Sequence, residues 1–229
     1  MHRSVPATLA IACAFALAAC SPGGDAAADS APAAASPPAD APADMQPAAA
    51  PADAFLAAIA RHCSQAFAGR IVANAPDPTA PPPAAPDPFE GQTLVMHVRG
   101  CADPTRRIEI PFHVGEDRSR TWILTRTPDG LRLKHDHRHE DGSDDAVTLY
   151  GGDTAGPGSA TRQEFPVDAE SIAMFEREGL NASVRNTWAM EIEPGERFLY
   201  ELSRPGGRMF QVEFDLTAPV AVPPTPWGW

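Results

Sequence analysis

Three histidines, His135, His137 and His139, alternate with charged residues directly after Leu131 and Leu133. Side chains along a β-strand point alternately to its two faces, so these five residues are expected to share one face. On such a strand His135 and His137 would lie about 6.6 Å apart. At that spacing two imidazoles can converge on one divalent metal ion such as zinc. His139 would lie about twice as far from His135, so a third ligand would have to come from elsewhere.

The same segment also fits the polar end of a core strand. Asp136, Arg138 and Glu140 would then point outward and form cross-strand charge pairs worth about 0.2 to 1 kcal/mol each. His97 and His113 fall on outward positions of their own expected strands, so neither is an obvious third ligand. Since a metal site needs that ligand and supporting hydrogen bonds, the polar strand end is favoured. A metal site on the histidines stays open as the alternative, and no other cofactor is expected.

The histidine segment belongs to a series of short runs in which every second residue is apolar. Five such runs are expected between residues 94 and 149, the last of them at Val147 and Leu149, and Gly, Pro and Asp turns separate them. The glycine-rich stretch 151–158 is expected to be a mobile connection. Three longer runs between residues 188 and 216 predict a three-stranded antiparallel meander.

Two helices are expected beside these strands. Apolar residues recur every four positions within residues 54–68, namely Phe55, Ile59, Cys63 and Phe67, and Gly69 follows as a stop signal. A second, short helix is expected to begin after Asp168, whose side chain suits an N-cap, and to end at Gly179.

The expected fold class is therefore mainly β, an antiparallel barrel or sandwich with an N-terminal helix and one short inserted helix. A lipocalin-like barrel with a helix over one mouth accounts for these elements, although the Gly-x-Trp motif usual at the lipocalin N-terminus is absent.

The first twenty residues have the features of an export signal. A short basic start precedes an apolar run that is too short to span a membrane. The run ends in Leu17-Ala18-Ala19-Cys20, which resembles the lipobox of bacterial lipoproteins. The resemblance implies a signal peptide over residues 1–19 and a lipidated Cys20, with palmitate among the acyl chains. Because Ser21 rather than Asp follows, it also implies the outer membrane, with the protein facing the periplasm.

Composition divides the rest of the chain. Residues 20–52 are almost wholly Ala, Pro, Asp, Ser and Gly, which predicts a disordered tether. Residues 53–229 suit one domain, with a proline-rich loop at 75–88 and a proline-rich tail at 218–229. The formal net charge of −12 argues against nucleic acid as a partner. In an exported domain, Cys63 and Cys101 are most simply a disulfide.

No catalytic motif stands out. The serines lack the Gly-x-Ser-x-Gly and Ser-x-x-Lys contexts of hydrolases. We therefore expect a lipid-anchored, non-enzymatic envelope protein, whose β-rich domain binds a protein partner or a small apolar ligand. The alternative is a metal-binding or metal-dependent site built on His135 and His137.

Overall fold

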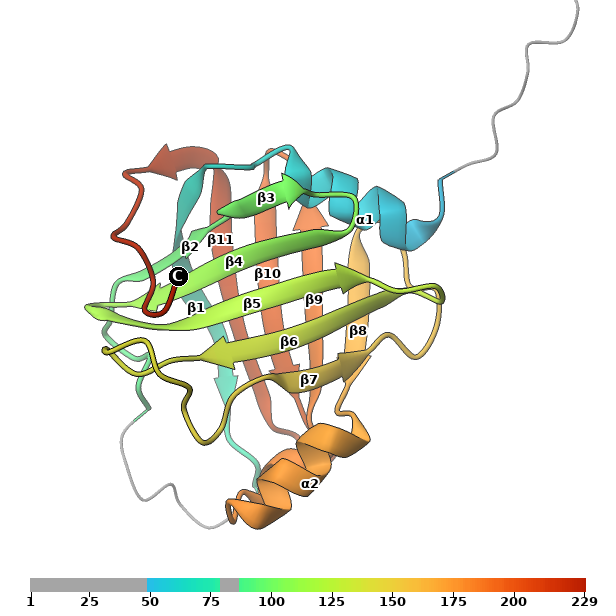
Figure 1. Ribbon diagram of the computed structural model, residues 1–229, viewed down its shortest axis with the longest axis vertical. Coiled ribbons are helices and arrows are strands. Elements are labelled where there is room, and N and C mark those ends of the chain that lie inside the picture. The colour runs from blue at the N-terminus through green and yellow to red at the C-terminus, as the bar shows by residue number, and fades with distance from the viewer. Residues whose placement is uncertain (1–48, 79–86) are drawn as a thin grey trace, which may run out of the picture. The chain divides into compact units, whose positions relative to one another are not determined.

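The computed structural model describes residues 49–78 and 87–229. The predicted signal peptide, Cys20, most of the tether and the middle of loop 75–88 lie outside these residues. The described part forms one eleven-stranded antiparallel sheet that curls into a nearly closed barrel, with two α-helices (Figure 1). The expected mainly β fold is confirmed, and of the two expected architectures the structure has the barrel.

The helical elements are α1 (Pro51–Ala60), α2 (Ala169–Arg177) and the short 3-10 helix η1 (Asn181–Arg185). The strands are β1 (Ala66–Ala75), β2 (Leu94–His97), β3 (Gly100–Asp103), β4 (Arg107–Val114), β5 (Asp117–Arg126), β6 (Leu131–His137), β7 (Tyr150–Asp153), β8 (Arg162–Pro166), β9 (Thr187–Glu193), β10 (Arg197–Ser203) and β11 (Met209–Val220).

Neighbouring strands in the barrel are mostly neighbours in sequence. The order is β7-β6-β5-β4-β2-β1-β11-β10-β9-β8, and β3 pairs with β4 beyond the end of β2. The first and last strands, β1 and β11, pair with each other in the middle of this order. The two strands at its ends, β7 and β8, close the barrel without a ladder of their own.

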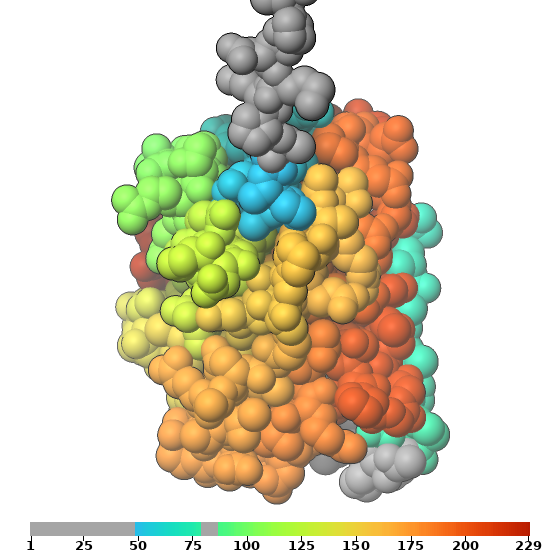
Figure 2. Space-filling view, turned by 90° about the vertical axis from the view of Figure 1, so that its right-hand side faces the viewer, coloured from blue at the N-terminus to red at the C-terminus, as the bar shows by residue number. Residues whose placement is uncertain are grey.

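Backbone and side-chain contacts seal the seam between β7 and β8. The backbone N–H of Asp168 donates to the carbonyl of Gly151 at 2.9 Å, and the hydroxyl of Ser171 accepts from the N–H of Gly151 at 2.8 Å. A Cβ at Gly152 would lie 1.8 Å from the carbonyl oxygen of Pro166, so only glycine fits there. Figure 2 faces this side, with α1 at the top and α2 at the bottom.

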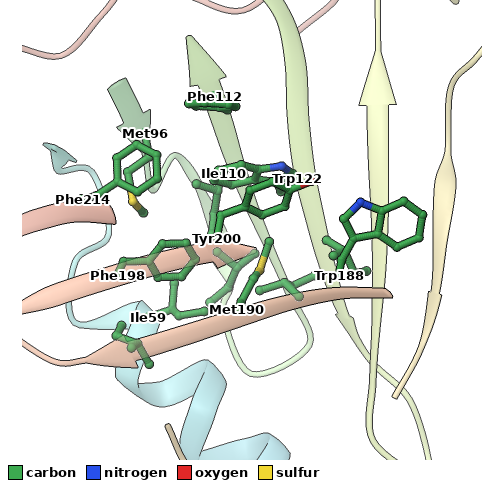
Figure 3. Packing of buried hydrophobic residues seen from close by; sticks show 14 of the residues in the cluster. Ile59, Met96, Ile110, Phe112, Trp122, Trp188, Met190, Phe198, Tyr200 and Phe214 are labelled. Carbon is green, nitrogen blue, oxygen red and sulfur yellow. The ribbon is translucent and has the colours of Figure 1, made fainter. Parts of the chain in front are cut away.

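Helix α1 covers one end of the barrel, opposite the end where α2 lies (Figure 1). Its proline at the first turn suits a helix start, and the residues at i, i+3, i+4 and i+7 that it buries are Ala52, Phe55, Leu56 and Ile59. Ile59 belongs to the same cluster of buried apolar side chains as Met190 of β9 and Phe198 of β10 (Figure 3). The α1 end is therefore filled with apolar side chains.

The expected helix over residues 54–68 is too long at its C-terminal end. Helix α1 stops at Ala60, Ser64 takes a left-handed φ of 68°, and Phe67 lies on β1. The sequence did not predict β1 because alanines and a glycine make up half of it. Gly69 is not a helix stop: a Cβ there would lie 2.5 Å from the Phe214 ring, so glycine lets that ring pack on the strand.

Two further predictions are corrected around β7 and β8. The strand expected at Val147 and Leu149 begins only at Tyr150, because Leu149 has a left-handed φ of 54°. The stretch 151–158, expected to be a mobile connection, instead begins with the last three residues of β7. Strand β8 was not predicted. The inserted helix is confirmed as α2, and the Asp168 carboxylate accepts a hydrogen bond from the Ser171 N–H at 2.8 Å.

The C-terminal tail lies against the outer side of β5 and β6. The backbone N–H of Trp227 donates to the backbone carbonyl of Arg118 at 3.1 Å. The indole N–H of Trp229 donates to the Asp136 carboxylate at 3.1 Å. Asp136 is only 1% exposed, although the sequence places it on an outward position. Arg138, two residues further along the chain, pairs with it at 3.0 Å. Arg138 also pairs with Asp144 at 2.6 Å across an antiparallel bridge, so a cross-strand charge pair forms there as expected.

A disulfide joins Cys63 to Cys101, with 6.1 Å between their Cα atoms. Cys63 lies in the turn after α1 and Cys101 lies on β3. The bond therefore ties the helix that covers one end of the barrel to the wall of the barrel.

Candidate functional site

Two adjoining cavities lie inside the barrel, toward the end where α2 and η1 lie. The outer one has a volume of about 400 Å³ and the inner one about 50 Å³. Both are lined by Phe89, His137, Tyr150 and Tyr200, so they meet at these four side chains. The covered α1 end contributes no residue to either cavity.

Apolar and aromatic side chains make up much of the wall. Trp122 and Phe112 stack in the inner cavity with ring centroids 4.8 Å apart, and Trp122 stacks on Tyr200 at 4.4 Å. Figure 3 shows these three rings in one group. Besides Phe89, which both cavities share, the apolar side chains of the outer cavity are Val147, Phe175, Leu180, Trp188, Leu202 and Phe210. Such a wall suits an apolar ligand.

His135 lies in the wall of the inner cavity, on β6. It is 3% exposed, and its ring stacks on Tyr150 with centroids 4.7 Å apart. Nδ1 donates to the backbone carbonyl of Tyr150 at 3.2 Å, so Nε2 accepts from the Tyr200 hydroxyl at 2.9 Å. Burial, with a smaller effect from the charge on His137, lowers the pKa of His135 to about 3. The imidazole is therefore neutral at pH 7, and both nitrogens are occupied.

His137 faces both cavities from the end of β6. Its Nε2 shares a hydrogen bond with the Tyr150 hydroxyl at 3.1 Å. Burial, and then the positive charge of Arg120, lower the pKa of His137 to about 4, while burial raises the pKa of Tyr150 to about 12. Both groups are neutral at pH 7, so this pair offers polarity to a ligand without charge.

The third histidine does not join the other two. His139 lies beyond the end of β6 and is exposed, whereas His135 and His137 point into the barrel. No three His, Cys, Asp or Glu side chains of residues 49–78 and 87–229 come together in a way that could hold a metal ion. His97 and His113, on outward positions of their strands, are buried at 7% and 4% exposure and line neither cavity.

Several residues of the site were not predicted as functional. Tyr150 directly precedes the stretch expected to be a connection, and Tyr200 lies in the expected meander, yet each shares a hydrogen bond with a histidine. Arg120 lines the inner cavity because it occupies an inward position of β5, two residues before Trp122. An arginine that continues the inward side of a core strand was the one available sequence signal.

Searches of this chain against protein-family models, curated proteins and solved structures found no match. Function is therefore argued from the cavities and the residues that line them.

Proposed function

We propose that this protein is a binding protein for a small, mainly apolar molecule, which it holds in the two adjoining cavities of its barrel. The observation that carries the proposal is the outer cavity of about 400 Å³, lined by apolar and aromatic side chains and open beside α2. This volume is within the range of about 300 to 1,000 Å³ that is typical of small-molecule sites.

The polar groups in the wall favour binding over acid–base catalysis. A general base or acid works best with a pKa near the pH of its surroundings. His135 and His137 have pKa values of about 3 and 4, and Tyr150 has one of about 12. These groups also hydrogen-bond to one another, so they orient a ligand by polarity and shape.

Fluorescence of N-phenyl-1-naphthylamine, a neutral apolar probe, tests the proposal. We expect saturable binding to the purified barrel. Val147 lines the outer cavity, so Val147→Trp should fill part of it and weaken binding by about tenfold or more. The matched control is Val222→Trp, because Val222 is 58% exposed and lines neither cavity. Absence of saturation, or equal affinity in both variants, would contradict the proposal.

We also propose that the barrel lies in the bacterial envelope, anchored through Cys20 and facing the periplasm. The lipobox resemblance of residues 17–20 supports this, and Cys20 lies outside the described residues. In the part of the chain that the structure describes, no helix has the length and apolar character needed to cross a membrane.

Fractionation of cells tests the anchor. We expect Cys20→Ser to move the protein from the membrane fraction to the soluble fraction, because the acyl chains then have no attachment site. Cys13→Ser, in the same predicted signal peptide, is the matched control and should leave the protein in the membrane. If the Cys20→Ser protein stays in the membrane, the lipid anchor is wrong. Ser21→Asp should shift an anchored protein toward the inner membrane.

A further inference from the structure

Two arginines lie between β10 and β11, where this hairpin borders the outer cavity. Along β10 the inward residues Tyr200 and Leu202 are followed at the same spacing by Arg204, and Arg208 precedes the inward Phe210 of β11. The backbone N–H of Arg204 donates to the backbone carbonyl of Arg208 at 3.1 Å, so the two residues lie opposite each other in the hairpin. Both line the outer cavity and are partly buried. The hairpin therefore changes from apolar to cationic along its inward side.

Neutral groups hold both guanidinium groups in place. Nε of Arg204 donates to the side-chain oxygen of Asn186 at 2.5 Å. Nη1 of Arg208 donates to the side-chain oxygen of Asn74 at 2.7 Å and to the carbonyl of Ala75 at 3.0 Å, and the group lies over the Phe210 ring, 5.6 Å from its centroid. These contacts fix the direction of each group without neutralising its charge.

Neither arginine forms an ion pair with a carboxylate of the described residues, whereas Arg120 of the inner cavity pairs with Asp117. Burial lowers the pKa of Arg204, and Arg208 and Arg185 lower it further by repulsion, while Asp77 opposes them. Asp145 also lines the outer cavity. Two arginines and one aspartate therefore line the outer cavity, in a chain whose formal net charge is −12.

We propose that the ligand is an apolar molecule with a carboxylate group, and that Arg204 and Arg208 bind this group at the mouth while its apolar part lies along Phe210, Trp188 and Tyr200. This inference rests on the proposed function and specifies its ligand class. The planar guanidinium group has the geometry to donate two parallel hydrogen bonds to a carboxylate. The inner cavity suits the apolar part, since its histidines and tyrosines bond to one another and the charge of Arg120 is paired with Asp117.

Competition against N-phenyl-1-naphthylamine separates the two parts of the ligand. Dodecanoate and 1-dodecanol share the same chain and differ in the head group. We expect dodecanoate to displace the probe from the full domain at a concentration about tenfold lower than 1-dodecanol needs. A hydrogen bond to a charged group contributes about this factor to an affinity. Added salt should reduce this preference. Dodecanoate is used below the concentration at which it forms micelles, and 1-dodecanol is used below its solubility limit.

The double variant Arg204→Gln with Arg208→Gln should bind dodecanoate no better than dodecanol, with the affinity for dodecanol unchanged. Arg204→Lys with Arg208→Lys keeps the charges and should keep part of the preference. Arg70→Gln is the matched control, because the Arg70 side chain is 74% exposed and lines neither cavity.

The outcomes distinguish this inference from the proposed function. Equal affinity of the wild-type protein for acid and alcohol overturns the carboxylate site and leaves apolar binding intact. Equal weakening of both compounds in the glutamine variant also overturns it, since the arginines would then only support the fold. If neither compound displaces the probe and the probe itself does not saturate, the proposed function fails.

Discussion

At the scale of single residues, His135 shows what a strand pattern can and cannot reveal. Its inward position after Leu131 and Leu133 follows from the alternation of the strand. Its chemistry depends on Tyr150 and Tyr200, which come from β7 and β10 and occupy both of its ring nitrogens. A sequence pattern gives the face of a residue, but partners from other strands decide whether an imidazole is a ligand or a buried neutral group.

The low pKa of His135 makes stability depend on pH. Its pKa falls from the ordinary 6.5 to about 3 on folding, so between these pH values the unfolded chain binds a proton that the native protein does not. The free energy of unfolding therefore falls as the pH falls below 6.5, by up to about 1.4 kcal/mol per pH unit for this one group. His135→Gln should make that slope shallower by this amount.

Urea unfolding at pH 7, 6 and 5 measures the slope. His139→Gln is the control, because His139 is exposed and outside the barrel. A slope that does not change in His135→Gln would show that this imidazole is not buried in its neutral form.

At the scale of elements, predictability follows the apolar pattern of each strand. The meander of β9, β10 and β11 alternates large apolar residues with polar ones, and the sequence predicted it. Strand β1 and the glycines of β7 fit where neighbouring backbone or rings come too close for a side chain, as at Gly69 and Gly152. Small residues chosen for close approach look like turns or helix ends in a sequence.

The C-terminal tail stabilises β6 through a single indole. The N–H of Trp229 donates to the carboxylate of Asp136, which is 1% exposed and also accepts from Arg138 and Thr148. Trp229→Phe keeps an aromatic ring and removes the donor, so we expect the free energy of unfolding to fall by about 1 to 2 kcal/mol. Val222→Ser, at a residue 58% exposed, serves as the control in the same urea titration. Equal midpoints for the two variants would contradict a stabilising role of the indole.

At the scale of the whole molecule, alternating strands established an antiparallel sheet but left barrel and sandwich open. The sheet curls into a barrel through the pairing of β1 with β11, and the sequence did not reveal β1 as a strand. The cavity is harder still to predict, because it is the space that side chains from many strands leave unfilled. Arg204 and Arg208 carried a readable signal, since both continue the inward side of apolar strands.

The pairing of β1 with β11 gives this barrel a high contact order. Ala66 meets Val220 and Ala75 meets Met209, so the chain must close nearly its full described length before the centre of the sheet exists. Loop closure over such separations slows folding and leaves strand edges exposed in the meantime. The Cys63–Cys101 bond spans only 38 residues and can form before that closure. We therefore expect refolding with the bond intact to be faster than refolding of the reduced chain.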